Sequence, residues 1–360
     1  MKKLMVVTRN LKAGGAERVI SQLINRFCEE GIECIIVTVD EAQVFYTIDP
    51  RVKLYSVGKK SDKLYVDKFL RYKVVRKYAQ FEKPDLVLAL PEEIGVFVIP
   101  ALLGTGIPVV VSERNNPWVM PWKKETRLMR RLFYPFAAGF IFQTDQAASF
   151  FPKYIQKKGI VLPNPLDLTR IPEPWKGHRR KEVVGAGRLE KQKNFHLLIE
   201  AFARFHRYHP DYILTIYGEG SLRRKLHEFA ASIMPEDAFR FLGNVPDLLD
   251  RINGAAMFVL SSDYEGMPNV LIEAMAMGMP VISTDCPAGG PSYLIKHNEN
   301  GILIPVGDVD ALYKAMCKIA EDNEFSNKLG KHACQIKEKL DSVVILKKWR
   351  EFLSYVAKHN

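Results

Sequence analysis

Residues 256–273 read AMFVLSSDYEGMPNVLIE: an apolar run, a polar loop and a second apolar stretch. This pattern predicts a buried strand, a loop and the start of a helix. Glu265 would lie in the loop and Glu273 about a turn into the helix. The unpaired N–H groups of a helix start, here at Asn269 and Val270, favour an anion. Two carboxylates beside such a turn suit a ligand that is part phosphate and part polyol, such as a nucleotide sugar.

The rest of the chain alternates short apolar runs with amphipathic stretches, of which 16–30 and 66–81 are expected helices. Strands are expected at 4–8, 34–39, 52–57, 85–90, 108–112, 139–143 and 159–162, and then at 182–186, 212–217, 239–242, 257–261, 280–284 and 302–305. Because these strands are apolar throughout and alternate with helices, they predict α/β architecture with parallel sheets.

Length and composition indicate two globular domains. A chain of 360 residues is long for one core. Pro163, Pro165, Pro172 and Pro174 interrupt the pattern near its middle. We therefore expect domains at 1–165 and 166–341. Two doubly wound domains facing each other would form a cleft where the carboxyl ends of their strands converge.

Several classes of protein are disfavoured by composition. No apolar run approaches the ~20 residues of a membrane span, and the start, MKKLMVV, is expected to be a first strand rather than a signal peptide. The five cysteines are scattered and form no CxxC pair, which indicates a reducing cytoplasm and no structural zinc site.

Positive charge is concentrated in the first half. Residues 1–170 carry 27 lysines and arginines against 17 aspartates and glutamates, a net charge of +10 out of +11 for the whole chain. This asymmetry favours an acidic partner for the first half: anionic lipid, a phosphorylated acceptor or nucleic acid.

Two cations follow the expected strand at 182–186. Arg188 and Lys193 lie in the segment GRLEKQKN at 187–194. A planar guanidinium and a compact ammonium suit a diphosphate, although a solvated basic loop would look the same. Gly14 and Gly15 form a second turn between a strand and a helix, where the absence of side chains lets a ligand approach closely.

Together, Glu265, Glu273, Arg188 and Lys193 resemble the donor-site motifs of the large retaining glycosyltransferase family with the GT-B fold, family 4 (glycosyltransferase group 1). Within it the chain is similar to bacterial lipid-linked glycan and polysaccharide glycosyltransferases. The resemblance implies two facing Rossmann-like domains, the first for the acceptor and the second for the nucleotide-sugar donor. It also implies that a helix at about 342–360 packs back onto the first domain.

The resemblance implies a role for each donor-site residue. Arg188 and Lys193 would stabilise the departing nucleoside diphosphate, Glu265 would orient the sugar and support charge at its ring, and Glu273 would hold the ribose hydroxyls. Glu265, Arg188 and Lys193 are the expected catalytic residues. The remaining donor-binding positions are Gly14, Gly15, Gly218, Gly243, Asn244, Val245, Gly266, Met267, Pro268, Asn269 and Val270.

Neither a metal nor a cofactor is expected. The sequence Asp308-Val-Asp310 mimics a metal motif of other glycosyltransferases, but Asp308 is better placed to cap a helix. No other cluster of His, Cys or Asp suggests a metal site. In the family the donor phosphate is thought to take the acceptor proton, so no separate base is assigned.

The acceptor side offers basic and aromatic residues. Segment 123–136 is amphipathic: Met129, Leu132, Phe133 and Phe136 share one face, and Lys123, Lys124, Arg127, Arg130 and Arg131 share the other. Trp118 and Trp122 precede it, and Lys68, Tyr72, Lys73 and Arg76 lie opposite a stripe of Leu70, Val74, Tyr78 and Phe81. Such residues suit a membrane interface, although a solvated basic face over an ordinary core would read alike.

One family feature is missing. Many members have a His after the fifth strand, whereas all eight His here lie beyond residue 177, which leaves Glu113, Arg114 or Asn115 in that place. The acceptor and membrane candidates are Lys68, Arg76, Glu113, Arg114, Asn115, Trp118, Trp122, Lys123, Arg127 and Arg130.

The sequence thus predicts a retaining, metal-independent enzyme that moves a hexosyl or N-acetylhexosaminyl group from a nucleoside diphosphate sugar, expected to be UDP-linked, to a glycan acceptor. A polyprenyl-diphosphate-linked acceptor in bacterial surface polysaccharide or glycoconjugate synthesis is expected, at the inner face of the cell membrane.

Other classes stay open. An epimerase on the same fold would need no acceptor. A NAD-dependent oxidoreductase is disfavoured by the incomplete glycine fingerprint at Gly14 and Gly15, and a non-catalytic partner subunit by the presence of all four charged donor residues. Nucleic acid would explain the basic half of the chain but not the acidic pair, so no nucleic-acid partner is expected.

Overall fold

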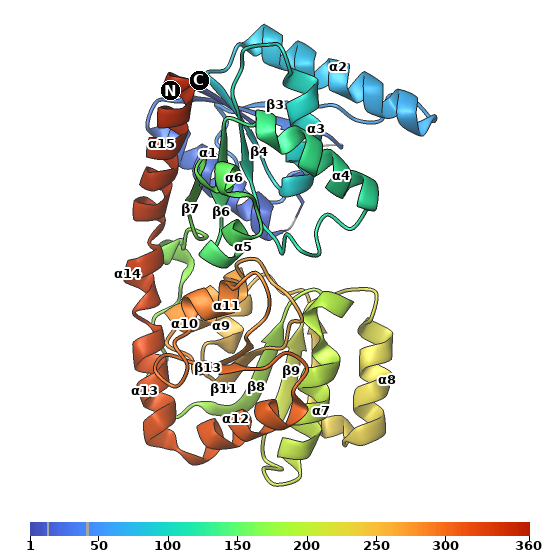
Figure 1. Ribbon diagram of the computed structural model, residues 1–360. Coiled ribbons are helices and arrows are strands. Elements are labelled where there is room, and N and C mark those ends of the chain that lie inside the picture. The colour runs from blue at the N-terminus through green and yellow to red at the C-terminus, as the bar shows by residue number, and fades with distance from the viewer. Residues whose placement is uncertain (13, 41–42) are drawn as a thin grey trace. The chain divides into compact units, whose positions relative to one another are not determined.

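The computed structural model describes residues 1–12, 14–40 and 43–360 (Figure 1). Within them the chain forms two compact units. Unit 1 comprises Met1–Pro165 and Ser342–Asn360, and unit 2 comprises Leu166–Asp341. Each unit is built on its own parallel sheet.

Unit 1 contains a seven-stranded sheet in the order β3-β2-β1-β4-β5-β6-β7. The described strand pairs are all parallel. Its strands are β1 (Lys3–Thr8), β2 (Glu33–Thr38), β3 (Lys53–Ser56), β4 (Leu86–Ala89), β5 (Val109–Ser112), β6 (Gly139–Phe142) and β7 (Gly159–Val161). The strand order reverses direction between β1 and β4, which makes the sheet doubly wound.

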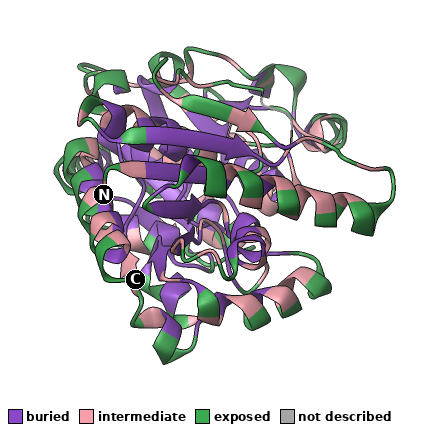
Figure 2. Ribbon diagram, turned by 90° about the horizontal axis from the view of Figure 1, so that it is seen from above, coloured by how far each residue is buried: buried purple, intermediate pink, exposed green. Residues whose placement is uncertain are grey.

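Helices cover both faces of the unit 1 sheet. Leu4 and Val6 of β1 join the core under α1 (Gly15–Glu29) and α15 (Ser342–His359). Met5 and Val7 point the other way, into the core under α2 (Leu64–Glu82), α3 (Glu92–Leu102) and α4 (Lys124–Phe133). The short helices α5 (Asp145–Ser149) and α6 (Lys153–Gln156) flank β6 and β7. The inner strands are buried, the edge strands β3 and β7 are partly exposed, and the outer helix faces are exposed (Figure 2).

Helix α15 returns the chain to unit 1 after unit 2. Its Trp349 is fully buried, together with Ile345, Leu346 and Leu353. The guanidinium of Arg114 lies 5.8 Å from the centre of the Trp349 ring. Because emptying a buried Trp site costs about 3–5 kcal/mol, this helix is an integral part of unit 1.

Unit 2 contains a six-stranded parallel sheet in the order β10-β9-β8-β11-β12-β13. Its strands are β8 (Arg180–Ala186), β9 (Ile213–Tyr217), β10 (Phe239–Gly243), β11 (Ala255–Leu260), β12 (Val281–Thr284) and β13 (Ile302–Ile304). The order reverses between β8 and β11, so the carboxyl ends of these two strands mark the point where ligands bind in doubly wound sheets.

Two sets of helices enclose this second sheet. One core lies under α7 (Phe195–His206), α8 (Arg223–Ile233) and α12 (Val309–Glu321). The other lies under α9 (Leu248–Ile252), α10 (Asn269–Ala276), α11 (Gly290–Leu294) and α14 (Ile336–Leu340). Helix α13 (Asn323–Ala333) connects the two sets.

Each strand expected from the sequence overlaps an observed strand, and both sheets are parallel and doubly wound. The predicted α/β class and the two Rossmann-like folds are therefore confirmed. No helix among the described residues has the length and apolar character needed to span a bilayer.

A cluster of ionisable groups lies inside unit 1, at the carboxyl ends of β4 and β5. The Glu113 side chain accepts a hydrogen bond from the hydroxyl of Tyr134, and both residues are buried beside the carboxylate of Glu92. Burial, and after it the charge of Glu92, raise the pKa of Glu113 to about 7. The folded unit therefore favours the neutral acid at position 113.

This cluster makes the stability of the protein depend on pH. The pKa of Glu113 in the folded protein lies above its ordinary value of 4.5. The stability that the protonated Glu113 contributes to the fold is therefore fully present below pH 4.5 and is lost as the pH rises through about 7. We expect Glu113→Gln, which is neutral throughout and can still accept from Tyr134, to gain stability relative to the natural protein, on the order of 2 kcal/mol, between about pH 5 and about pH 8.

The measurement is urea denaturation at a series of pH values. The matched control is Glu93→Gln, a partly exposed neighbour on α3, which should leave the pH dependence of the natural protein intact. A Glu113→Gln curve parallel to the natural one would show that Glu113 is already ionised in the fold.

Candidate functional site

The loops that follow β8 and β9 in unit 2 touch backbone to backbone. A Cβ atom on Gly218 would lie 2.0 Å from the carbonyl oxygen of Gly187, and one on Gly220 would lie 2.4 Å from that of Leu189. Hydrogen bonds join the same loops, from Gly187 N to Tyr217 O at 3.0 Å and from Leu189 N to Glu219 O at 2.9 Å. Glycine is therefore required for this approach, which brings the first basic loop, 187–194, against the sheet edge.

Lys193 and Glu265 form an ion pair at the point where the strand order reverses. Lys193 Nζ lies 2.5 Å from Glu265 Oε1, with side-chain exposures of only 13% and 8%. The hydroxyl of Ser262 donates to the same oxygen at 2.6 Å. The structure thus brings together two of the three residues that the sequence singled out as catalytic.

Side chains that the sequence analysis did not single out tie the two loops together. Asn194 Nδ2 donates to Asp263 Oδ1 at 2.7 Å, and Gln192 Nε2 donates to the carbonyl oxygen of Tyr264 at 2.9 Å. Asn194 also caps α7 from a left-handed conformation, φ +40°. These bonds join the loop at 187–194 to the loop that carries Glu265, and so hold Lys193 opposite Glu265. Their partners are about 70 residues away, so local sequence patterns carry no signal for them.

Arg188, the third expected catalytic residue, is exposed at the mouth of this site. Its guanidinium reaches Gln192 Oε1 at 3.4 Å, a long contact that leaves most of its donors available to a ligand. The site therefore offers one buried cation, Lys193, and one exposed cation, Arg188.

The start of α10 supplies backbone donors beside the ion pair. The helix begins at Asn269 with no side-chain cap on its first turn, and the start of a helix carries a partial positive charge. Glu273 is buried one turn further in. A Cβ on Gly290 would lie 1.8 Å from Gly266 O and 3.0 Å from Pro268 Cδ. The backbone at Gly290 therefore packs directly against the segment at 266–268.

The loop after β10 closes the same edge of the sheet. Gly218 N donates to Gly243 O at 2.8 Å, and both glycines have positive φ, +124° and +69°. Asn244 is exposed and Val245 is partly buried beside them. This loop therefore offers mainly backbone groups to a ligand.

A buried thiol lies near Glu265. Burial raises the pKa of Cys286 to about 12, and the charge of Glu265 adds to the effect. The thiol is therefore neutral and is not a nucleophile at ordinary pH.

The expected residues of unit 1 are placed differently from one another. Gly14 is the N-cap residue of α1, and its carbonyl accepts from the hydroxyl of Tyr46 at 3.2 Å. Glu113 belongs to the buried cluster described above, and Arg114 donates inward to Asn164 Oδ1. Of the three residues that stand where the family His is usual, Asn115 is partly exposed and points to no described partner outside its own turn.

The two faces of α4 are less regular than the sequence pattern. Arg130, a candidate for acceptor or membrane contact, is buried and donates to the carbonyl oxygens of Met120 at 2.8 Å and Pro117 at 3.0 Å. Met129 and Phe133 pack against the core, whereas Leu132 and Phe136 are 54% and 62% exposed. The physical reason is that the loop at 117–121 buries carbonyl groups that need donors, and a guanidinium fork satisfies two of them.

Arg127 and Arg76 also bind backbone rather than facing solvent. Arg127 donates to the carbonyl oxygen of Pro121 at 2.7 Å, and Arg76 donates to those of Ala101 at 3.1 Å and Leu103 at 2.7 Å, at the end of α3. Substitution of either arginine would therefore leave backbone carbonyl groups without a donor and would destabilise the fold.

Helix α2 carries an exposed surface that is both apolar and basic. Of the apolar stripe on this helix, Val74 and Tyr78 pack against the core, whereas Phe81 is 75% exposed. Near the helix start the exposed side chains, here called the α2 patch, are Leu64, Tyr65, Val66, Lys68, Phe69 and Lys73. Trp118 and Trp122 are exposed in the loop before α4, and Lys123 is exposed next to them.

Asp308 is a helix cap, as its position predicted. Its carboxylate accepts from Ala311 N at 2.8 Å at the start of α12. The Asp-x-Asp sequence is therefore used for capping on its first acid, while Asp310 pairs with Arg204.

Comparison with known proteins gives matches over nearly the whole chain. The model for "Glycosyltransferase Family 4" matches residues 13–170, and that for "Glycosyl transferases group 1" matches 170–335. A similar protein is the GalNAc-alpha-(1->4)-GalNAc-alpha-(1->3)-diNAcBac-PP-undecaprenol alpha-1,4-N-acetyl-D-galactosaminyltransferase of Campylobacter jejuni, 27% identical over 99% of both chains. Another is the lipopolysaccharide core biosynthesis glycosyltransferase LpsE of Rhizobium meliloti, 27% identical over 89% of both.

Solved structures show the same fold. Sucrose-phosphate synthase of Thermosynechococcus elongatus superposes with a TM-score of 0.85, at 18% identity and full coverage of both chains. Anabaena HepE in complex with UDP and glucose gives 0.83, at 18% identity over 99% of this chain and all of HepE. The family expected from the sequence is confirmed: the chain belongs to glycosyltransferase family 4, group 1, and is a glycosyltransferase with the GT-B fold.

Proposed function

We propose that this glycosyltransferase transfers a hexosyl or N-acetylhexosaminyl group from a UDP-sugar to a glycan carried on a polyprenyl diphosphate. Transfer retains the anomeric configuration and uses no metal ion. The observation that carries the proposal is the Lys193–Glu265 ion pair, held between two interlocked loops at the reversal point of the unit 2 sheet.

Donor binding exchanges one anion for another on Lys193. Without a ligand, Glu265 balances the Lys193 ammonium at 2.5 Å. An incoming diphosphate competes for the ammonium, and Arg188 folds onto it from solvent. Glu265 is then free to accept hydrogen bonds from the sugar hydroxyls. N–H groups at the start of α10 add a third source of positive potential, and Glu273 takes the ribose hydroxyls.

The two cations then stabilise the leaving group. The bond between the anomeric carbon and the phosphate oxygen breaks, and negative charge grows on the diphosphate next to Lys193 and Arg188. A hydroxyl of the acceptor bonds to the anomeric carbon on the same face, and its proton passes to the departing phosphate oxygen. The products are UDP and the extended glycan. Lys193 and Arg188 supply the charge that a divalent ion supplies in other transferases.

Relatives support the choice of donor and acceptor. HepE of Anabaena and TarM of S. aureus have each been solved with UDP. Two Campylobacter jejuni relatives are named for transfer of N-acetylgalactosamine onto undecaprenyl-diphosphate-linked glycans. We extend these chemistries to the present chain on the strength of the shared family.

The acceptor side of the proposal rests on unit 1. An exposed apolar and basic helix start, two exposed indoles and a net charge of +10 over residues 1–170 all favour an anionic membrane surface. A lipid-linked acceptor is confined to such a surface. We therefore place the enzyme at the inner face of the cell membrane, held by peripheral contact, in the synthesis of a surface polysaccharide or glycoconjugate.

The Glu265→Gln variant tests the assigned chemistry. The amide loses the charge that supports the sugar ring, so we expect transfer to slow by about 10²–10³-fold, while UDP binds at least as tightly as to the natural protein, because no carboxylate competes for Lys193. The measurement is UDP release in a single turnover with a lipid-linked glycan acceptor, beside calorimetric UDP binding.

Glu228→Gln, an exposed acid on α8, serves as the control and should behave as the natural protein. A near-normal rate for Glu265→Gln would remove Glu265 from the mechanism. Epimerised UDP-sugar formed by the natural protein without any acceptor would instead indicate an epimerase.

The α2 patch can be tested apart from catalysis. We expect the protein to co-sediment with vesicles that contain anionic lipid more than with neutral vesicles. Each lysine near a charged bilayer contributes about 1 kcal/mol, so Lys68→Glu/Lys73→Glu should weaken binding by at least about 10-fold.

Lys328→Glu/Lys331→Glu reverses the same charge on exposed positions of α13 in unit 2 and should bind nearly as the natural protein does. Equal recovery of the natural protein in the supernatant with both vesicle types would rule out the membrane contact.

A further inference from the structure

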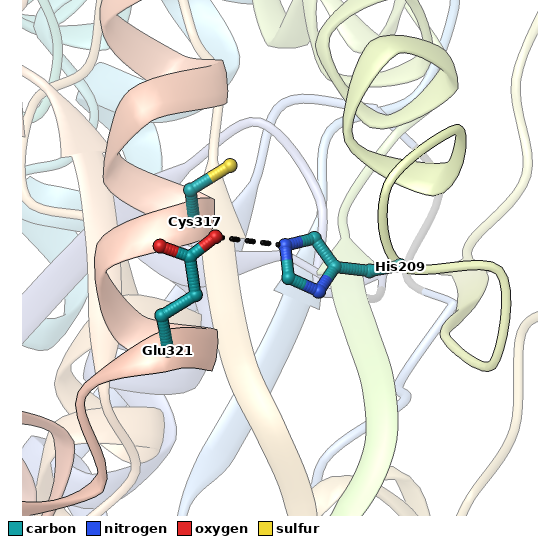
Figure 3. A group of neighbouring side chains, drawn as sticks. All are labelled: His209, Cys317 and Glu321. Atoms are coloured by element: carbon teal, nitrogen blue, oxygen red, sulfur yellow. Dashed lines mark hydrogen bonds and ion pairs between the residues drawn. The ribbon is translucent and has the colours of Figure 1, made fainter.

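Three potential metal ligands lie close together in unit 2, although one of them is more than 100 positions from the other two in the sequence. His209 lies in the turn between α7 and β9, and Cys317 and Glu321 lie on α12. Their ligand atoms all fall within 4.8 Å of one another, and His209 Nε2 lies 3.1 Å from Glu321 Oε1 (Figure 3).

Packing holds all three side chains in place. Cys317 and Glu321 are four residues apart, so they share one face of α12. The opposite face of that helix is anchored by Leu312 and Met316, which are fully buried in the core shared with α7. His209 lies in the turn after α7, and its ring stacks on Phe205 of α7, with ring centres 4.4 Å apart. The packing of α7 against α12 therefore positions the two ligands on α12, and the ring stack on α7 positions the third.

The ligand set identifies the metal. A thiolate, an imidazole and a carboxylate suit Zn²⁺ and exclude Ca²⁺ and Mg²⁺, which take oxygen ligands. Zinc–nitrogen and zinc–oxygen bonds are about 2.0–2.1 Å, so two tetrahedral ligands of this kind lie about 3.3 Å apart. The spacing of 3.1 Å between His209 and Glu321 is close to that value. Without a metal ion, His209 pairs with Glu321 and the Cys317 thiol hydrogen-bonds to Tyr313, so the zinc ion would replace Tyr313 as the partner of the sulfur.

We propose that His209, Cys317 and Glu321 bind a zinc ion, with water in the fourth position. No metal site was expected from the sequence, in which His209 and Cys317 are 108 positions apart.

The zinc site is separate from the donor site. His209 precedes β9, and Cys317 and Glu321 lie near the end of α12, the helix that follows β13. The ligands therefore lie at the amino edge of the parallel sheet, whereas Lys193 and Glu265 follow the carboxyl ends of β8 and β11. The ion would join the α7–β9 turn to α12 and would stabilise unit 2 without touching the donor.

Cobalt provides a direct test, because it takes zinc sites and reports a bound thiolate by a charge-transfer absorption band. Purified protein is stripped with chelator, titrated with Co²⁺ and then challenged with Zn²⁺. We expect one equivalent of Co²⁺ to give the thiolate band and Zn²⁺ to abolish it. We also expect Zn²⁺ to raise the thermal unfolding midpoint.

Matched variants assign the signal to the three residues. Cys317→Ser should lose the band and the thermal shift, and should keep its transfer rate. Cys334→Ser, another partly buried cysteine of unit 2, should keep both. Glu321→Gln can still bond to His209, so it preserves the fold, and its metal affinity should fall by at least 10-fold. The proposal fails if the natural protein gives no thiolate band, or if Cys317→Ser gives the same one.

Discussion

The ion pair between Lys193 and Glu265 is the interaction on which the donor site depends. Each side chain is nearly removed from solvent, and a buried charge without a partner costs several kcal/mol. The pair therefore holds two loops, separated by about 70 residues of sequence, in one arrangement. A buried ion pair contributes little net stability, because removing two charges from water costs about as much as their attraction returns. Such a pair suits a site in which a diphosphate replaces the carboxylate as the partner of the lysine.

Backbone geometry makes that arrangement possible. Where Gly187 meets Gly218, and where Gly266 meets Gly290, a single methyl group would overlap a carbonyl oxygen. Close approach of this kind collects the carboxyl ends of β8, β9, β10 and β11 into a small area, which is the area where a doubly wound sheet binds ligands. The family relationship and the physical argument thus lead to the same edge of unit 2. Unit 1 has the same architecture, but its corresponding edge encloses the buried acids Glu92 and Glu113 instead.

Much of the fold could be predicted from the sequence, and the reason is physical. A strand of a covered parallel sheet is apolar on both faces, so runs such as 34–39 and 257–261 are visible without knowledge of their partners. Lys193 and Glu265 could be singled out because each follows such a strand in a segment that resembles the donor-site motifs of the family. Which face of each helix would be buried was harder to predict. Arg130 is buried because the loop before it needs hydrogen-bond donors, and a helical wheel contains no information about a loop. Asn194 with Asp263, and His209 with Cys317, could not be found, since only the tertiary fold brings them together.

The central claim is that Lys193 binds the donor diphosphate without help from a metal ion. The most direct test is calorimetric titration of the protein with UDP, GDP and ADP in the presence of a chelator, repeated with Lys193→Ala and with Lys191→Ala, an exposed lysine of the same turn. The account predicts saturable binding of UDP to the natural protein and to Lys191→Ala, and a loss of about 10–100-fold in Lys193→Ala. Unchanged UDP affinity in Lys193→Ala, or UDP binding that appears only when a divalent ion is added, would contradict it.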